Sequence, residues 1–201
     1  FASMIVFRNH SQEIPFKKLK TFYDEAVLKK QKIVEAISVS SYCPKEKEVF
    51  SRYVNLKYVD SNKLIFFSNY NSPKAKQFEL HKQVSLSIFW NVTNVQIRMR
   101  GMIDKTSPEF NEVYFAARSQ EKNALAISSD QSKKINSYDD VVQKYQNTLK
   151  SKDLKSCPSY WGGFSFEPYY IEFWQGHESR INKRLAYEKI SDVWNEYFLE
   201  P

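Results

Sequence analysis

Residues 84–103 read VSLSIFWNVTNVQIRMRGMI, and this stretch decides the class of fold. Apolar and polar side chains alternate from Val84 to Asn91 and again from Val95 to Ile103, as expected for two strands that each bury one face. Only Val92, Thr93 and Asn94 separate the two runs. Because so short a connection can join antiparallel strands but not parallel ones, we predict an antiparallel pair.

Similar strand patterns flank this pair on both sides. They cover residues 33–42, 49–59 and 63–69 before it and residues 161–175 and 184–190 after it. Helical patterns cover residues 16–30, 73–81, 108–117, 121–128 and 138–149. Ser72 and Ser137 are the expected N-caps of the second and the last of these helices, and Ser107 begins the third. The five successive strands, together with the two late strands at residues 161–175 and 184–190, favour a closed or nearly closed antiparallel β-barrel with helices outside. Closure is favoured because it leaves no exposed strand edge. We therefore predict a mixed, mainly β fold.

The length and composition fit one domain. A chain of 201 residues with 42% hydrophobic residues can build a single core, so we treat residues 1–201 as one unit and interpret residues 1–3, which precede Met4, as a remnant of cloning. Cys43 and Cys157 are isolated and no secretory segment is evident, so we expect reduced thiols and a cytoplasmic protein. No apolar run is long enough for a membrane span, and the His and Cys spacing predicts no metal site.

Glycine is scarce, and this excludes several phosphate-binding motifs. The four glycines are Gly101, Gly162, Gly163 and Gly176, so neither a dinucleotide fingerprint nor a Walker loop is present. Side chains must therefore hold any bound phosphate. Lys and Arg exceed Asp and Glu by 30 − 23 = 7, but the basic residues are spread along the chain, which disfavours the alternative of a single-stranded nucleic-acid binder without removing it.

Two early segments could bind an anion. Strand alternation places Arg52 and Lys57 on opposite faces unless a bulge intervenes. Residues 68–74 run from a polar loop into a helix N-terminus, where free N–H groups and the charge of Lys74 favour an anion. Solvated strand residues and an ordinary capped turn explain the same segments equally well.

Two later segments have similar potential. Tyr114 and Arg118 share a helix face, and Lys122 follows one turn along if the helix continues, which suits a phosphate monoester. Residues 129–132 offer short polar side chains to a ring or a phosphate, and equally form a plain connection.

The most specific strings lie near the end of the chain. Trp161-Gly162-Gly163, Ile171-Glu172-Phe173-Trp174-Gln175-Gly176 and Arg180-Ile181-Asn182-Lys183-Arg184 contain rare residues at fixed separations. With the earlier segments, they make the chain resemble the pyridoxamine 5′-phosphate oxidase family in linear order from about Phe16 to Pro201. The resemblance implies an FMN-binding split β-barrel that forms a homodimer with FMN at the subunit interface and binds neither nucleic acid nor a membrane.

The resemblance also implies roles for individual residues. The expected FMN-binding residues are Arg52, Tyr53, Val54, Asn55, Leu56, Lys57, Phe67, Ser68, Lys74, Gln96, Gln131, Ser132, Trp174 and Arg184. The expected residues for the phosphorylated substrate are Lys57, Tyr114, Arg118, Lys122, Arg180 and Asn182, with Arg180 and Asn182 as the catalytic pair that covers the pyridine ring.

The implied activity is the oxidation of pyridoxamine or pyridoxine 5′-phosphate to pyridoxal 5′-phosphate, a step of pyridoxine biosynthesis, with O₂ as acceptor and H₂O₂ as product. The chain departs from the family pattern at Pro73, Lys122, Asn182 and Lys183, where the family has Arg, Ser, His and Asp. These departures leave two alternatives: a divergent flavoprotein that oxidises another substrate, as in phenazine pathways, or a non-catalytic FMN-binding protein.

Overall fold

The computed structural model describes residues 4–151 and 153–201, and the interpretation of residues 1–3 lies outside the described residues. The strands are β1 (Val6–Arg8), β2 (Ala36–Cys43), β3 (Glu48–Asp60), β4 (Lys63–Asn69), β5 (Gln83–Trp90), β6 (Val95–Lys105), β7 (Trp161–Gln175), β8 (Lys183–Ile190) and β9 (Val193–Leu199). The helices are α1 (Ile14–Leu28), α2 (Pro73–Leu80), α3 (Pro108–Ala117), α4 (Gln120–Ser128) and α5 (Tyr138–Ser151).

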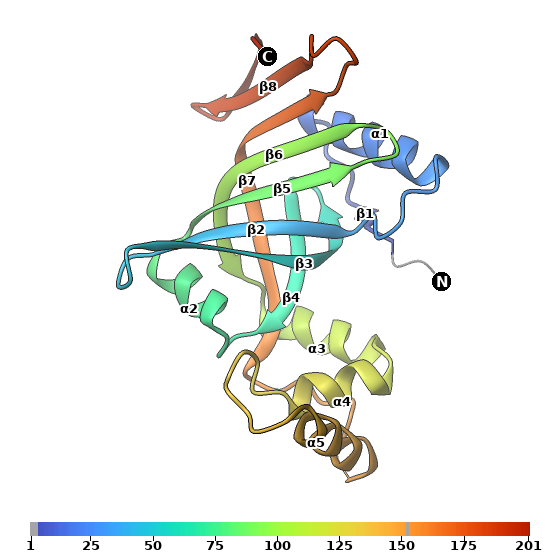
Figure 1. Cartoon of the computed structure of the whole chain (residues 1–201), viewed down its shortest axis with the longest axis vertical. Helices are drawn as coiled ribbons and strands as arrows, with labels where there is room; N and C mark the ends of the chain where they lie inside the picture. The colour runs from blue at the N-terminus through green and yellow to red at the C-terminus, as the bar shows by residue number, and fades with distance from the viewer. Residues whose placement is uncertain (1–3, 152) are drawn as a thin grey trace.

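Six strands close the barrel (Figure 1). They follow one another in the order β3, β2, β5, β6, β7 and β4, and β4 pairs again with β3, with every neighbouring pair antiparallel. The predicted fold class, a mainly β split barrel with helices around it, is confirmed. Strands β8 and β9 continue the sheet beyond β7, and β1 adds a short parallel strand to β3.

The barrel interior holds the apolar half of each alternating strand. Ile37, Leu86 and Ile97 point inward from three neighbouring strands and have no measurable exposure. Burying one such side chain contributes about 1.5–3 kcal/mol. Helix α1 covers one end of the barrel, where Phe22 stacks on Phe173 with a centroid distance of 5.3 Å.

Helices α3, α4 and α5 lie together at the opposite end from α1 (Figure 1). Asn111 fixes α3 there, because its Nδ2 donates to the Tyr70 hydroxyl (3.0 Å) and its Oδ1 accepts from the Gly163 amide (2.8 Å) and the Thr106 hydroxyl (2.6 Å). A Cβ at Gly162 would lie 2.2 Å from the Tyr70 hydroxyl oxygen and 2.3 Å from Asn111 Nδ2, so a side chain here would force these two groups to move. The contacts tie α3 firmly to the start of β7.

The structure corrects three local expectations. Helix α3 ends at Ala117, the backbone of Arg118 is extended, and Lys122 belongs to α4, so one helix does not carry all of the predicted phosphate ligands. Ser72 precedes α2 but its side chain caps no backbone N–H. Strands β1 and β9 were not predicted, because β1 has only three residues and most side chains of β9 are exposed or half-buried.

No helix within residues 4–151 and 153–201 combines the length and the apolar character that crossing a membrane requires.

Candidate active site

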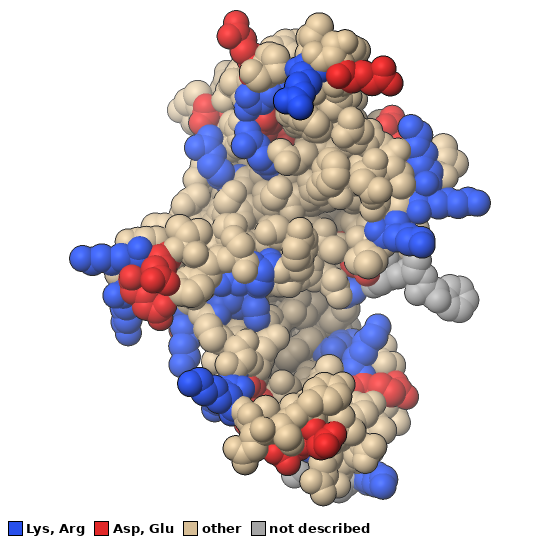
Figure 2. All heavy atoms as spheres, in the orientation of Figure 1, with Lys and Arg blue, Asp and Glu red and all other residues tan. Residues whose placement is uncertain are grey.

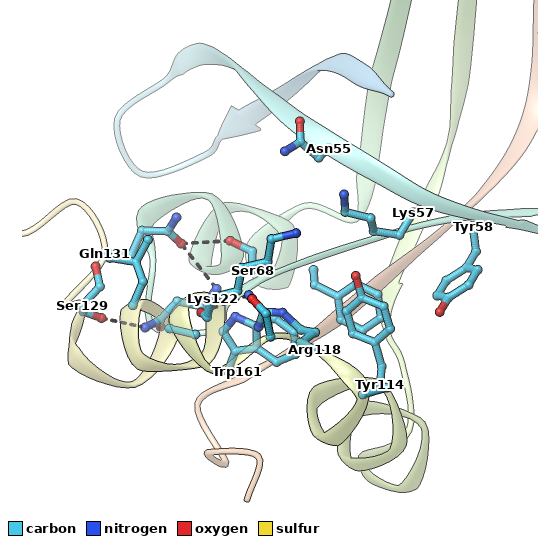
Figure 3. A pocket seen from close by; sticks show the side chains of 16 residues that line it. Asn55, Lys57, Tyr58, Ser68, Tyr114, Arg118, Lys122, Ser129, Gln131 and Trp161 are labelled. Carbon is cyan, nitrogen blue, oxygen red and sulfur yellow. Dashed lines mark hydrogen bonds between the residues drawn. The ribbon is translucent and has the colours of Figure 1, made fainter. Parts of the chain in front are cut away.

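A cavity of about 600 Å³ lies between the barrel and the helical end of the molecule (Figure 3). Strands β3, β4 and β7 form one part of its wall, and α3, α4 and the segment after α4 form the rest. Its lining residues are Asn55, Lys57, Tyr58, Phe67, Ser68, Asn69, Tyr114, Ala117, Arg118, Ser119, Lys122, Leu125, Ala126, Ser129, Gln131 and Trp161.

Among the described residues, three cations and no carboxylate line this cavity. Lys57 extends from β3, and Arg118 and Lys122 come from the end of α3 and from α4 (Figure 3). Burial lowers the pKa of Lys57; the charge of Glu35 raises it, and those of Lys122 and Arg118 lower it. Figure 2 shows Lys and Arg side chains on both sides of the hollow between the barrel and the helices. Such a surplus of positive charge attracts anionic ligands.

An aromatic wall faces Lys57. The rings of Phe67 and Tyr114 stack with centroids 3.7 Å apart and planes 9° apart, and Trp161 lies parallel to Phe67 at 5.3 Å. Burial raises the pKa of Tyr114 to about 12, so its hydroxyl stays protonated at neutral pH and can donate a hydrogen bond. The three rings give the cavity an aromatic, largely apolar side opposite its charged groups, as in many sites for small ligands.

Arg118 is held in place with part of its hydrogen-bonding capacity unused. Its guanidinium lies 4.4 Å from the centroid of the Trp161 ring, and its Nη2 donates to the Lys122 carbonyl at 3.1 Å. Its Nη1 is buried and has no hydrogen-bond partner within residues 4–151 and 153–201. A buried donor without an acceptor is unfavourable, and an anion in the cavity would supply the acceptor.

Lys74 and Arg52 form a second cationic pair beside the cavity. Burial, and then the charge of Arg52, lower the pKa of Lys74 to about 8. Lys74 donates to the Ser68 hydroxyl (2.9 Å), the Gln131 side-chain oxygen (3.1 Å) and the Ser72 hydroxyl (3.3 Å). Arg52 donates to the Ser41 hydroxyl (2.7 Å), the Gln77 side-chain oxygen (2.8 Å) and the Val39 carbonyl (3.2 Å). All six acceptors are neutral. Two cations held near each other without a counter-ion in the described part of the chain are suited to bind an anion.

Three other predicted FMN residues, Gln96, Trp174 and Arg184, form a separate cluster. Gln96 lies opposite Trp174 in the β6–β7 register, and Trp174 lies opposite Arg184 in the β7–β8 register. Glu172, which is fully buried, accepts hydrogen bonds from Arg184 (2.8 Å) and from Arg98.

This second cluster is far from the cavity within one chain. Trp161, in the cavity wall, and Trp174 lie at opposite ends of β7, separated by 13 residues or roughly 40 Å of strand. The expected catalytic pair lies in the loop after β7. Arg180 is exposed with φ 59°, and the Asn182 side-chain oxygen accepts from the His177 amide at 3.0 Å. A single chain therefore does not bring Arg180 and Asn182 to Lys57 and Arg118.

Four further predicted FMN residues, outside the two groups just described, also present no side chain to the cavity. Tyr53 is 77% exposed on the outside of β3, Val54 packs against the core, and Leu56 is buried within it. These three can offer a ligand in the cavity only backbone groups. Ser132 lines a neighbouring groove instead.

Several residues of the site were not predicted as site residues. Trp161 belongs to a string that the sequence marks only as rare, and no pattern marks Tyr58 in the cavity wall or Ser41 and Gln77, which hold Arg52. Their roles depend on contacts between distant segments, and no local pattern in the sequence marks them.

Comparisons with known proteins agree with this architecture. Residues 161–201 match the family model described as the pyridoxine 5′-phosphate oxidase C-terminal dimerisation region. The chain is 34% identical to pyridoxine/pyridoxamine 5′-phosphate oxidase 1 of Hydrogenovibrio crunogenus over 94% of its own length and 89% of that protein. It is 36% identical to the pyridoxine/pyridoxamine 5′-phosphate oxidase of Colwellia psychrerythraea over 83% of its own length and 77% of that protein.

Solved structures share the fold. PhzG from Burkholderia lata, determined in complex with tetrahydrophenazine-1-carboxylic acid, superposes with a TM-score of 0.88 at 22% identity, covering 93% of this chain and 92% of PhzG. A pyridoxamine 5′-phosphate oxidase-related, FMN-binding protein from Nostoc punctiforme gives a TM-score of 0.78 at 12% identity, covering 94% of this chain and 99% of that one.

Proposed function

The chain belongs to the pyridoxine/pyridoxamine 5′-phosphate oxidase family, and from this premise we propose that it is an FMN-dependent oxidase of pyridoxamine or pyridoxine 5′-phosphate. The products would be pyridoxal 5′-phosphate and H₂O₂. When the substrate is the amine, one water is consumed and ammonia is released as well. The observation that carries the proposal is the cavity, which joins a stack of aromatic rings to three cations, with no carboxylate among its described lining residues.

The donor set fits FMN. Lys74 and Arg52 lack a counter-ion in the described part of the chain, and a phosphate dianion would supply one. Ser68 and Gln131 already contact Lys74 and would complete the phosphate site by exchanging partners. When bound, FMN supplies the acceptor for a hydride from the C4′ carbon of the substrate and passes the electrons to O₂.

Residues of the cavity would bind the substrate at the same time. Lys57, Arg118 and Lys122 would hold its phosphate, which would give the unpartnered Nη1 of Arg118 an acceptor. Burial raises the pKa of Tyr114 to about 12, so its hydroxyl is protonated at neutral pH and would donate to the phosphate rather than repel it. These residues orient the ring, and no side chain needs to act as a general base.

A homodimer would complete the site. Gln96, Trp174 and Arg184, as well as the loop with Arg180 and Asn182, lie far from the cavity of their own chain. A second copy could place them against the cavity, with FMN between the subunits and the proposed catalytic pair over the pyridine ring. The match to a dimerisation region over residues 161–201 supports this arrangement.

Absorbance and turnover test the proposal. The purified protein should be yellow, and it should release H₂O₂ when pyridoxamine 5′-phosphate or pyridoxine 5′-phosphate is added in air. A yellow protein that turns over neither compound would refute the substrate, and a colourless protein that does not take up added FMN would refute the cofactor as well.

One observation favours a second candidate, a family flavoprotein with another substrate. Lys57, Arg118 and Lys122 carry one positive charge more than a phosphate dianion needs, so a more highly charged substrate would also fit. Changing Lys122→Ser together with Asn182→His discriminates the two. A large gain in vitamer oxidation would indicate that these residues direct the native enzyme to another substrate, whereas a loss would favour the vitamers.

A further inference from the structure

Glu172 is a buried acid on the face of the sheet that points away from the core. Ile171 and Phe173, its neighbours along β7, belong to the core, so strand alternation places Glu172 on the opposite face. It nevertheless has no measurable exposure. Because burying an unpaired charge is costly, a carboxylate hidden from water on this face must be covered by its own partners.

Three side chains cover this carboxylate. Arg184 donates from Nε to Oε1 at 2.8 Å, Arg98 donates from Nη2 to Oε2, and the Tyr170 hydroxyl donates to Oε2 at 2.9 Å. Arg98 comes from β6 and Arg184 from β8, so the acid joins the strands on either side of β7. Burial alone would raise the pKa of Glu172, but the three hydrogen bonds hold it below its ordinary value, so the acid is charged at neutral pH.

The guanidinium of Arg184 is held at two of its three nitrogens. Glu172 accepts from Nε, and the Glu200 carbonyl accepts from Nη1 at 2.8 Å. Nη2 donates to no residue within residues 4–151 and 153–201. Because a guanidinium is planar and rigid, fixing two of its nitrogens also fixes the direction in which the third can donate.

Arg184 belongs to the row of residues that are proposed for FMN. In the register of β6, β7 and β8, Gln96 lies opposite Trp174, and Trp174 lies opposite Arg184. Residues directly opposite each other share a face of the sheet, so these three side chains form one row. Glu172 lies two residues before Trp174, on the same face and beside this row. The acid is therefore placed to orient Arg184 without lying in the row itself.

We propose that Glu172 is a positioning residue for FMN binding: it holds the Arg184 guanidinium so that its third nitrogen stays available for FMN at the subunit interface. This inference rests on the proposed function, in which the row with Trp174 meets the cavity of a second copy. Glu172 would act only through Arg184, because its own carboxylate is covered.

Positioning and simple charge predict opposite effects on FMN binding. FMN carries a phosphate dianion, so removing a nearby acid should strengthen its binding if only the charge of Glu172 mattered. If Glu172 acts by holding Arg184, removing the acid should weaken FMN binding although the site becomes more positive. The sign of the change in affinity therefore separates the two roles.

The experiment measures the affinity of the full chain for FMN at pH 7 by a fluorescence titration of the FMN-free protein. The test variant is Glu172→Met, which keeps the length of the side chain and removes both oxygens. We expect Glu172→Met to bind FMN about tenfold more weakly and Arg184→Met about ten to a hundredfold more weakly, as for the loss of a hydrogen bond to a charged group. In the Arg184→Met background, Glu172→Met should change the affinity less than about twofold, because the two residues act as one unit.

The matched control is Glu188→Met, the same substitution at a half-buried acid on the same face of β8, which accepts a hydrogen bond from Tyr197 at 3.3 Å. It should leave the FMN affinity within about twofold of the native value. An equal loss in this control would mean a general disturbance of the sheet and would overturn the proposal. FMN binding by Glu172→Met that is as tight as in the native protein, or tighter, would overturn it too, as would a loss that persists in the Arg184→Met background.

Sedimentation of each variant checks that the affinity is compared at the same oligomeric state. Glu172→Met should sediment like the native protein, and a loss of FMN affinity that only accompanies dissociation of the subunits would overturn the proposal. A native protein that binds no FMN would refute the proposed cofactor and this inference together. The expected series in a protein that oxidises neither vitamer would refute the proposed substrate and leave this inference standing.

A second variant covers the case in which Glu172→Met does not fold. Arg184→Lys keeps the positive charge, but its single nitrogen cannot be held at two edges and still donate from a third. It should therefore lose about as much FMN affinity as Arg184→Met. If Arg184→Lys binds FMN like the native protein, the held guanidinium is not needed and the proposal is wrong.

Discussion

Replacing Lys74 by Met should change stability and cofactor affinity in opposite directions. Lys74 is 9% exposed and its three acceptors are neutral, so without FMN the fold buries a charge that has no counter-ion among the described residues. Met keeps the length of the side chain and removes the charge. The protein without FMN should become more stable, and FMN should bind more weakly.

The size of the stability change follows from the pKa of Lys74. Burial lowers it from 10.5 to about 8. Below pH 8 both the folded and the unfolded chain carry the proton, so the full penalty applies, and 2.5 units correspond to about 3 kcal/mol. Between pH 8 and pH 10.5 the folded chain loses the proton first, so its stability rises with pH and the penalty disappears. Lost hydrogen bonds offset about 1 kcal/mol of the gain from Met, which leaves about 2 kcal/mol at pH 7.

Urea unfolding of the FMN-free protein at pH 7 and pH 10, with a fluorescence titration of FMN, measures both effects. Lys74→Met should be more stable than the native protein at pH 7, lose this advantage by pH 10, and bind FMN ten to a hundred times more weakly, since a hydrogen bond to a charged group contributes about 1.5–3 kcal/mol. Lys76→Met, at an exposed position of α2, is the control and should change neither quantity. A variant that is less stable at pH 7, or that binds FMN as tightly as the native protein, would refute the reasoning.

Three further predictions follow from single residues. Ile33→Asn should raise stability by about 1 kcal/mol, because Asn tolerates the left-handed backbone at φ 52° and the Ile side chain is 68% exposed; a lower melting temperature would contradict this. Gly162→Ala should lower the free energy of unfolding by about 1–3 kcal/mol, because its Cβ would lie 2.2 Å from the Tyr70 hydroxyl, and urea unfolding equal to the native protein would show that the site relaxes freely. Arg118→Ala should raise KM for pyridoxamine 5′-phosphate ten to a hundredfold in an H₂O₂ release assay, and an unchanged KM would exclude Arg118 from the phosphate site.

The barrel could be predicted because its strands carry their own signal. Residues such as Leu86 and Ile97 alternate with polar neighbours. The period is two because successive side chains of a strand point to opposite faces of the sheet and only one face is buried. Strand β1 gave no such signal, because three residues are too few to define a period and its pairing with β3 depends on a distant segment.

The site could be predicted only in part. Tyr114 and Arg118 were selected by spacing along an expected helix, yet α3 ends between them and the cavity is completed by α4. The parallel contact of Trp161 with Phe67 joins residues 94 positions apart, and a single sequence does not encode such a distance locally. The other site residues, such as Trp174 and Arg184, were expected only from the resemblance to a family, and they lie far from the cavity of their own chain.

The position of β7 in the barrel has a consequence for folding. Strand β4 completes the ring only through β7, which pairs Leu64 with Phe166 and Asn69 with Trp161. About a hundred residues separate these partners, so the ring cannot close on the ribosome until β7 has emerged. Until then β4 and β6 each keep an open edge that can pair with other chains. Late closure through distant contacts is slow, so nascent and refolding chains should be most prone to aggregate in the interval before β7 docks.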